Sequence, residues 1–260
     1  MHDYVCMQWT GPEQPRESAT YRAGHVNALH RMLANTSSRP FRLHCVTDDP
    51  AGIDDEVNVV SLPPYLAKMG VQFPKLFLFS REFERASGIE EAFLFLDLDA
   101  VILNDLSPLL DGGENLRTWR NPRGFKGRIS HLLNRRRPPC PYNTSIIKRR
   151  IGTCYEVWDD FTCLRAVQTQ YRNGNVFGPM VGVDQSWLFQ VYGLALPTWG
   201  PEDGVCRLRE YTSGAVDPDR ARVVFFPGTS NPWDEDIAAA HGWIRQHYPL
   251  GCLEEAAERS

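Results

Sequence analysis

The segment FLFLDLDAVILND, residues 93–105, constrains the fold of this chain more than any other stretch. Its nearly continuous apolar run over 93–103 is typical of a strand buried on both faces of a sheet. Two carboxylates, Asp97 and Asp99, interrupt the run, and their spacing places both side chains on one face of such a strand. Burying one unpaired carboxylate is costly, and two neighbouring ones repel each other. We therefore expect the pair to lie at the carboxyl end of the strand, facing a cation.

The rest of the chain alternates between strand-like and helix-like patterns. Expected strands cover 4–9, 41–49, 57–62, 93–103 and 221–228, and expected helices cover 22–35, 74–86, 153–172, 184–193 and 241–249. Gly88 is expected to end the second helix. Strands that alternate with helices indicate βαβ units, so we predict one α/β domain over 1–260 with a mostly parallel sheet and helices on both faces. Ligands of such sheets collect beyond the carboxyl ends of the strands.

Composition narrows the class of protein. The 260 residues are 42% hydrophobic and 23% charged, with a net charge of −4, as in an ordinary globular protein. No apolar run approaches the roughly 18 residues of a membrane span, and residues 1–4 do not match a signal peptide. The seven cysteines are scattered without a C-x-x-C pair, which argues against a zinc site or a disulfide scaffold. These absences predict a cytoplasmic protein.

Three interpretations of the acid pair are open. Carboxylate oxygens prefer Mg²⁺ or Mn²⁺, and such a cation can bridge them to a diphosphate. Alternatively, acids at a strand end can simply cap the following turn. DLDAV, residues 97–101, also fits the pattern of haloacid-dehalogenase-like phosphatases, with Asp97 as nucleophile and Asp99 as general acid. Those enzymes usually carry the motif on their first strand and need a second motif that contains two acids. The nearest segment here, GVDQS at 182–186, has only one acid.

Several motifs resemble, in order and spacing, the GT-A nucleotide-sugar glycosyltransferases, in particular the retaining glycogenin and bacterial galactosyltransferase-like group. The resemblance covers about residues 4–235. After an N-terminal strand and loop, it rests on CVTDD (45–49), FPKLFLF (73–79), FLDLDAVIL (95–103), YNTSIIKR (142–149), VDQSWL (183–188) and FFPGTSNPWD (225–234).

This resemblance implies a GT-A-like, Rossmann-like fold with a nucleotide-binding half over 1–105 and an acceptor-side half over 106–260. It implies hexosyl or pentosyl transfer from a nucleotide sugar, in particular a UDP-sugar, with retention. Asp97 and Asp99 would bind the metal, Asp97 would also contact the ribose, and Asp184 and Gln185 would lie beneath the sugar as catalytic residues. Donor-binding positions would further include Trp9, Thr10, Tyr21, Asp48, Lys75, Leu98, Asn143, Thr144, Ser145 and Gly228.

Several of these positions also have a simpler interpretation. Asp184 fits a helix N-cap. Trp9 and Tyr21 fit a hydrophobic core. The polar residues 143–145 fit an ordinary strand.

One departure from the group concerns the metal. The closing loop of the group supplies a histidine ligand, whereas this chain has Phe225, Phe226 and Pro227 at the candidate positions, and Asn231 replaces the usual lysine. Asp234 and His241 are the nearest substitutes. Because Mg²⁺ and Mn²⁺ accept several water ligands, the metal prediction stands without the histidine. A nucleotide-sugar-binding module with weak or lost catalysis is the alternative.

A basic segment lies between Glu114 and Glu156, where the sequence has no Asp or Glu. Residues 117–150 hold eleven Lys and Arg residues, among them Arg128, Arg135, Arg136 and Arg137 on the expected acceptor side. One interpretation is a solvated loop. The other is a surface for an acidic acceptor, such as a lipid phosphate, an anionic membrane, a phosphorylated glycan or nucleic acid.

Overall fold

The computed structural model describes residues 1–10, 21–67, 73–121, 140–162, 183–226 and 230–253, and the structural statements below concern these. Its main sheet has seven strands in the order β3-β2-β1-β4-β7-β6-β8. They are β1 (His2–Gln8), β2 (Phe41–Thr47), β3 (Asn58–Ser61), β4 (Ala92–Leu96), β6 (Leu116–Arg120), β7 (Tyr142–Arg150) and β8 (Thr198–Trp199). Only β7 runs antiparallel to its neighbours, β4 and β6. The predicted mostly parallel α/β sheet is therefore confirmed.

The predicted single strand over 93–103 is wrong. β4 ends at Leu96, and the chain turns at residues 97–99 before β5 (Ala100–Ile102). β5 belongs to a second sheet, where it pairs antiparallel with β10 (Val223–Phe225), which in turn pairs with β9 (Val205–Arg207). The apolar run is continuous because both strands are buried, so hydrophobicity alone does not reveal the break between the sheets.

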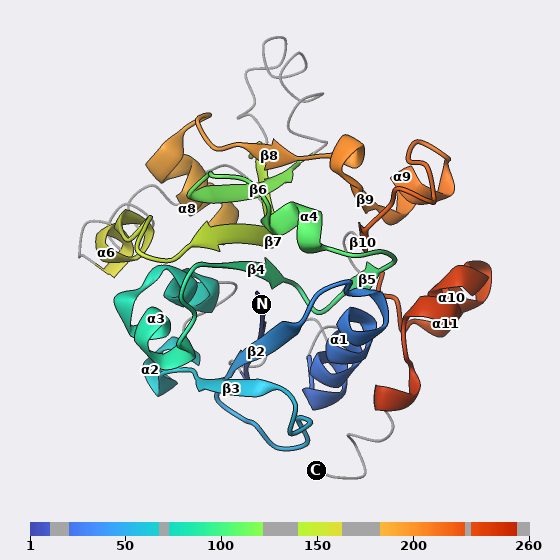
Figure 1. Cartoon of the computed structure of the whole chain (residues 1–260), viewed down its shortest axis with the longest axis horizontal. Helices are drawn as coiled ribbons and strands as arrows, with labels where there is room; N and C mark the ends of the chain where they lie inside the picture. Colours follow the sequence, from blue (N-terminus) through green and yellow to red (C-terminus); the bar gives the residue numbers. More distant parts are fainter. Residues whose placement is uncertain (11–20, 68–72, 122–139, 163–182, 227–229, 254–260) are drawn as a thin grey trace.

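Both faces of the main sheet are covered, as predicted. On β1, Tyr4 and Cys6 pack in one hydrophobic cluster, and Val5 and Met7 pack in the other. α1 (Ala23–Thr36) covers the first face, and η1 (Phe73–Phe79), α3 (Arg81–Ser87), α6 (Glu156–Thr162) and α8 (Val183–Tyr192) cover the second. Figure 1 shows these two layers on opposite sides of the stacked strands.

The predicted helix over 74–86 is two elements. A 3₁₀ helix, η1, ends before Ser80, whose hydroxyl accepts a hydrogen bond from the Phe83 backbone N–H at 3.0 Å and caps α3. Gly88, at φ 64°, ends α3 as predicted, because a left-handed residue there favours glycine. The serine side chain replaces a backbone partner and so divides the helical pattern.

The remaining elements are short. They are α2 (Pro64–Ala67), α4 (Ser107–Leu110), η2 (Pro201–Asp203), α9 (Leu208–Thr212), α10 (Glu235–Ala240) and α11 (Gly242–His247). The predicted helices at 184–193 and 241–249 are confirmed by α8 and α11. The predicted helix over 153–172 is confirmed only over α6, since 163–172 lie outside the described residues. Within the described part of the chain, no helix has the length and apolarity needed to cross a membrane.

Candidate functional site

The carboxyl ends of three neighbouring parallel strands meet at one edge of the main sheet. β1 lies between β2 and β4 and runs parallel to both. Trp9 and Thr10 follow β1, Asp48 follows β2, and Asp97 follows β4. Thr10 bonds Asp48 twice, through its backbone N–H at 3.0 Å and its hydroxyl at 2.6 Å. The fold thus places predicted donor-binding residues at a common edge, although they are distant in sequence.

Residues 97–99, hereafter the acid turn, present two carboxylates from a turn and not from one face of a strand. Leu98 is buried between the partly buried Asp97 and Asp99. The Asp97 backbone N–H donates to the Ser145 carbonyl at 2.8 Å, which ties the turn to β7. The buried Lys75 ammonium, from η1, lies 2.5 Å from Asp97 Oδ1. Lys75, predicted to point toward the donor, therefore binds the first acid of the motif.

β7 and α8 contribute the next part of the site. The Thr144 hydroxyl donates to Asp184 Oδ2 at 2.6 Å, and both residues are 1% exposed. Asp184 Oδ1 is also buried and has no hydrogen-bond partner among the described residues. Asp184 lies inside α8, so it is a helical residue, and the alternative interpretation as an N-cap does not hold. Asn143 has a local role, since its side-chain oxygen accepts from the Ser145 N–H at 2.7 Å.

The charges of this cluster do not balance. Lys75 is the cation that acts on Asp97, Asp184 and Asp99, so three carboxylates surround one ammonium and leave an excess of two negative charges when all are ionised. Burial, and then the charge of Asp97, raise the pKa of Asp99 to about 7. Burial also raises the pKa of Asp184, against the opposing effects of Lys75, the Thr144 hydrogen bond and a backbone hydrogen bond from Gln185. The carboxylates outweigh burial at Lys75 and raise its pKa. We call these four residues the acid-turn cluster.

Aromatic residues close one side of the acid turn. The Tyr21 hydroxyl hydrogen-bonds Asp99, and its ring lies 5.8 Å from His25 and 6.2 Å from Trp233 in edge-on contacts. Tyr248, just after α11, packs 6.0 Å from Trp233 and is 1% exposed. Burial chiefly raises the pKa of Tyr248, and the charge of Asp99 adds to that rise. Sequence reasoning missed Tyr248, because nothing local distinguishes it from any tyrosine that ends an amphipathic helix.

The residues present fit a hard divalent cation as part of its ligand set. Asp97 and Asp99 supply carboxylate oxygens, and Mg²⁺ is commonly bound by one or two carboxylates together with substrate phosphates and water. No group of three or more His, Cys, Asp or Glu able to hold a metal occurs among the described residues, so neither Asp234 nor His241 completes such a group there. The Asp234 carboxylate instead accepts the Asn231 N–H at 2.7 Å.

The positions expected for the missing histidine are filled by core residues. Phe225 and Phe226 are 2% and 4% exposed, and Phe225 stacks on Trp119 at 5.0 Å. Pro227 and the predicted donor-binding Gly228 lie outside the described residues.

The basic segment differs from the prediction where it is described. Arg128, Arg135, Arg136 and Arg137 lie outside the described residues. Four of the five described Lys and Arg side chains between 117 and 150 are bound internally: Arg117 to Glu114 and Asp203, Arg120 to Glu202, Lys148 to the carbonyls of Asp111 and Gly112, and Arg149 to Glu84. Three of these cations pair with acids from distant parts of the chain, namely Asp203, Glu202 and Glu84. The described part of the segment is therefore not a free basic surface.

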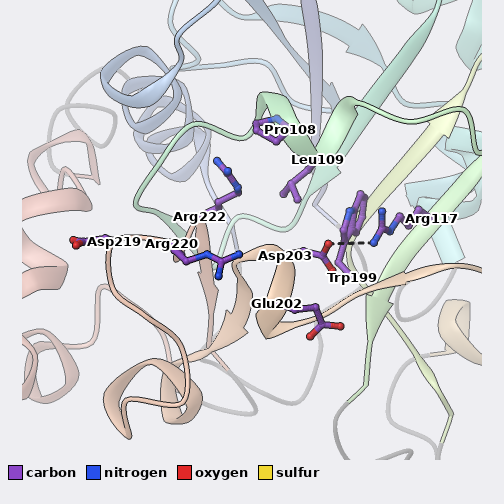
Figure 2. A pocket seen from close by; sticks show the side chains of 9 residues that line it. All are labelled: Pro108, Leu109, Arg117, Trp199, Glu202, Asp203, Asp219, Arg220 and Arg222. Atoms are coloured by element: carbon purple, nitrogen blue, oxygen red, sulfur yellow. Dashed lines mark hydrogen bonds and ion pairs between the residues drawn. The ribbon is translucent and has the colours of Figure 1, made fainter.

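A cavity of about 290 Å³ lies in this internally paired region (Figure 2). Its charged lining consists of three arginines and three acids, namely Arg117, Arg220, Arg222, Glu202, Asp203 and Asp219. Its lining includes none of the acid-turn cluster, and it lies at the Arg222 end of β10, whereas the Phe225 end of that strand pairs with Ala100 beside the acid turn. Because the charges of its lining balance, this cavity does not need a charged ligand as the acid-turn cluster does.

Comparisons with known proteins establish the fold. No protein-family model and no curated protein matches the sequence. Among solved structures, the galactosyltransferase LgtC in complex with donor and acceptor sugar analogues is similar at a TM-score of 0.62 and 16% identity, over 99% of this chain and 96% of that one. A glutamine-to-glutamate active-site mutant of LgtC is similar at 0.62 and 14%, over 98% and 95%.

The glycosyltransferase GlyE of Streptococcus pneumoniae TIGR4 is similar at a TM-score of 0.60 and 13% identity, over 99% of this chain and 63% of that one. At such identities the similarity speaks to architecture. The chain has the GT-A-like fold of these glycosyltransferases, as the order of its motifs predicts.

Proposed function

We propose that this chain is an enzyme that transfers a sugar from a nucleotide-sugar donor bound at the acid turn. The observation that carries the proposal is the excess of negative charge at the carboxyl edge of the sheet, where three buried or partly buried carboxylates have Lys75 as their one cation among the described residues. A protein tolerates such an excess when a bound ligand offsets it. The fold shared with glycosyltransferases supports a nucleotide sugar as that ligand.

Asp97 and Asp99 would hold a Mg²⁺ or Mn²⁺ ion, whose two positive charges match the excess of two negative charges. When bound, such an ion offsets the negative charge that develops on the departing nucleoside diphosphate. Within the protein, Lys75 fixes the orientation of Asp97, and Tyr21 fixes that of Asp99. The two carboxylates are thereby held in place before the donor arrives, which lowers the cost of binding.

The remaining residues would bind the donor itself. Trp9, Thr10 and Asp48 line the edge next to the acid turn, where they would contact the nucleotide. Asp184 and Gln185 would lie beneath the sugar, and the existence of an active-site glutamine in LgtC supports a role for Gln185. Retention and a UDP donor remain predictions, supported by the motif resemblance and by the lack of an obvious general base among the described site residues.

The acceptor class, the choice between hexose and pentose, the single-domain organisation and the cytoplasmic location also remain predictions. An anionic acceptor would depend on Arg128 and Arg135–Arg137, outside the described residues.

A nucleotide-sugar-binding module without turnover is the second candidate, because apolar core residues fill two of the candidate histidine positions. The fold does not favour the phosphatase alternative.

A thermal-shift panel of UDP-, GDP- and dTDP-sugars with and without Mn²⁺, followed by assays of donor hydrolysis and transfer, separates these functions. A saturating ligand at about 100 times its Kd stabilises the native state by about 2.7 kcal/mol. We expect a metal-dependent shift with one nucleotide class and turnover of that donor. A shift without turnover against any acceptor would indicate the binding module. Hydrolysis of p-nitrophenyl phosphate without any shift would indicate a phosphatase.

A further inference from the structure

We infer that Thr144 is a positioning residue that holds Asp184 so that Oδ1 is reserved for a hydroxyl of the donor sugar. The inference rests on the proposed function and adds a residue that selects the donor. Its geometric basis is the 2.6 Å hydrogen bond from the Thr144 hydroxyl to Asp184 Oδ2, between two side chains that are each 1% exposed. Asp184 Oδ1, in contrast, has no partner among the described residues.

The backbone explains why Thr144 can fix this orientation. Leu96, at the end of β4, pairs with Ile146 on β7, and the acid turn continues the pairing through the Asp97–Ser145 hydrogen bond. Thr144 is the next residue of β7, so its position is set by the register that also sets the acid turn. A β-branched side chain has few χ1 rotamers, and the hydroxyl therefore stays directed at one oxygen.

The chemistry of the free oxygen defines the ligand group. An ionised carboxylate only accepts hydrogen bonds. Thr144 donates to Oδ2, and the Gln185 backbone N–H also acts on this carboxylate, but no described residue makes a hydrogen bond to Oδ1 itself. Lys75 acts on Asp184 through its charge, but its ammonium is bound to Asp97. A buried acceptor without a donor is costly, and a sugar hydroxyl would satisfy it. A donor that presents a hydroxyl at this point would be selected over an epimer that does not.

Thr144→Val and Thr144→Ser test the inference, with UDP-galactose and UDP-glucose plus Mn²⁺ as probes. These two donors differ only in the orientation of one hydroxyl. For Thr144→Val we expect kcat/KM for donor hydrolysis to fall about ten- to a hundredfold, since a hydrogen bond to a charged group is lost. Thr144→Ser should restore most of it.

In the wild type, the Thr144 hydrogen bond favours the ionised form of Asp184. Its loss in Thr144→Val should raise the pKa of Asp184 and move the acidic limb of the pH profile to higher pH. A merely structural threonine would not move this limb.

A double-mutant cycle removes the dependence on how well Thr144→Val folds. If Thr144 acts through Asp184, adding Thr144→Val to Asp184→Asn should cost less than twofold, although it costs at least tenfold in the wild type. Equal costs in the two backgrounds would overturn the inference, as would a Thr144→Val enzyme with wild-type kcat/KM and pH profile.

Failure of the proposed function looks different: the wild type would neither bind nor turn over any nucleotide sugar. In that case crystal structures of the wild type and Thr144→Val decide the positioning role. A turned Asp184 carboxylate in the variant supports it, and an unchanged one overturns it.

Discussion

Two groups of charged residues in this molecule differ in whether their charges balance. Arg149, 0% exposed, bonds Glu84 at 2.6 Å and the Thr153 carbonyl, and Tyr155 completes the group by donating to Glu84 at 2.5 Å. In this Arg149 group the cation and the acid offset each other inside the protein. In the acid-turn cluster, three carboxylates share one cation, Lys75, within the described part of the chain. The comparison indicates that offset charges hold the fold together and that unbalanced ones mark where a ligand binds.

The largest expected effect is a loss of stability in the Arg149 group. Glu84→Gln leaves a fully buried guanidinium without its counter-charge, and breaking such a pair costs about 3–5 kcal/mol. Urea unfolding of the wild type and the variant measures this difference.

Glu82→Gln, an exposed change on the same helix, is the matched control and should stay within about 0.5 kcal/mol. Equal unfolding free energies for Glu84→Gln and Glu82→Gln would contradict the assignment of the Arg149 group to folding.

Asp99→Asn should show the opposite pattern. It removes a proposed metal ligand and a partly buried charge that Asp97 repels. Metal-dependent donor turnover should therefore fall at least about a hundredfold, or about 2.7 kcal/mol, while the unfolding free energy without ligand stays the same or rises. Steady-state kinetics with Mn²⁺ and denaturant unfolding measure the two quantities.

Asp159→Asn is the control for the acid turn, because it removes a half-exposed carboxylate paired with Arg81. It should leave turnover unchanged. Undiminished turnover in Asp99→Asn would exclude the metal role of the acid turn.

The pH dependence of stability sharpens the comparison. Asp99 has a pKa of about 7 in the folded protein against an ordinary 3.8, so the folded state keeps a proton that the unfolded state has lost. Its contribution to stability is complete below about pH 4 and is lost as the pH rises to about 7. The Tm of the ligand-free wild type should therefore fall across this window relative to that of Asp99→Asn.

Mn²⁺ should remove most of that fall, because it stabilises the ionised form. A Tm difference between wild type and Asp99→Asn that stays constant from pH 4 to pH 8 would show that folding does not raise the pKa of Asp99.

The smallest change in stability is expected at an ion pair on the surface. Arg120 and Glu202 lie 2.8 Å apart but are 42% and 59% exposed. Arg120→Ala should change the unfolding free energy by less than about 1 kcal/mol. Donor affinity in calorimetry should not change. A large loss of donor affinity would mean that the basic segment serves the site directly.

Much of the fold could be predicted because it depends on local patterns. The alternation of strands and helices, the strands at 4–9, 41–49 and 57–62, and the stop at Gly88 are confirmed. The predictions of one strand over 93–103 and one helix over 74–86 were wrong, because the turn at 97–99 divides the first and Ser80 divides the second. Apolar periodicity cannot distinguish one strand from two consecutive buried strands. For the site, the spacing of Asp97 and Asp99 was informative because few structural roles justify two acids within an apolar run.

By itself, the sequence determined that two acids follow a buried strand in an α/β chain, since both facts lie within a short window. Only the tertiary structure decided their partners. Lys75 is 22 residues from Asp97, Thr144 is 40 residues from Asp184, and Arg149 is 65 residues from Glu84. The basic segment looked unbalanced for the same reason, because Arg120 meets its acid 82 residues away. Charge balance is a property of space and not of sequence windows, so only the folded chain separates charges that support the fold from charges left for a ligand.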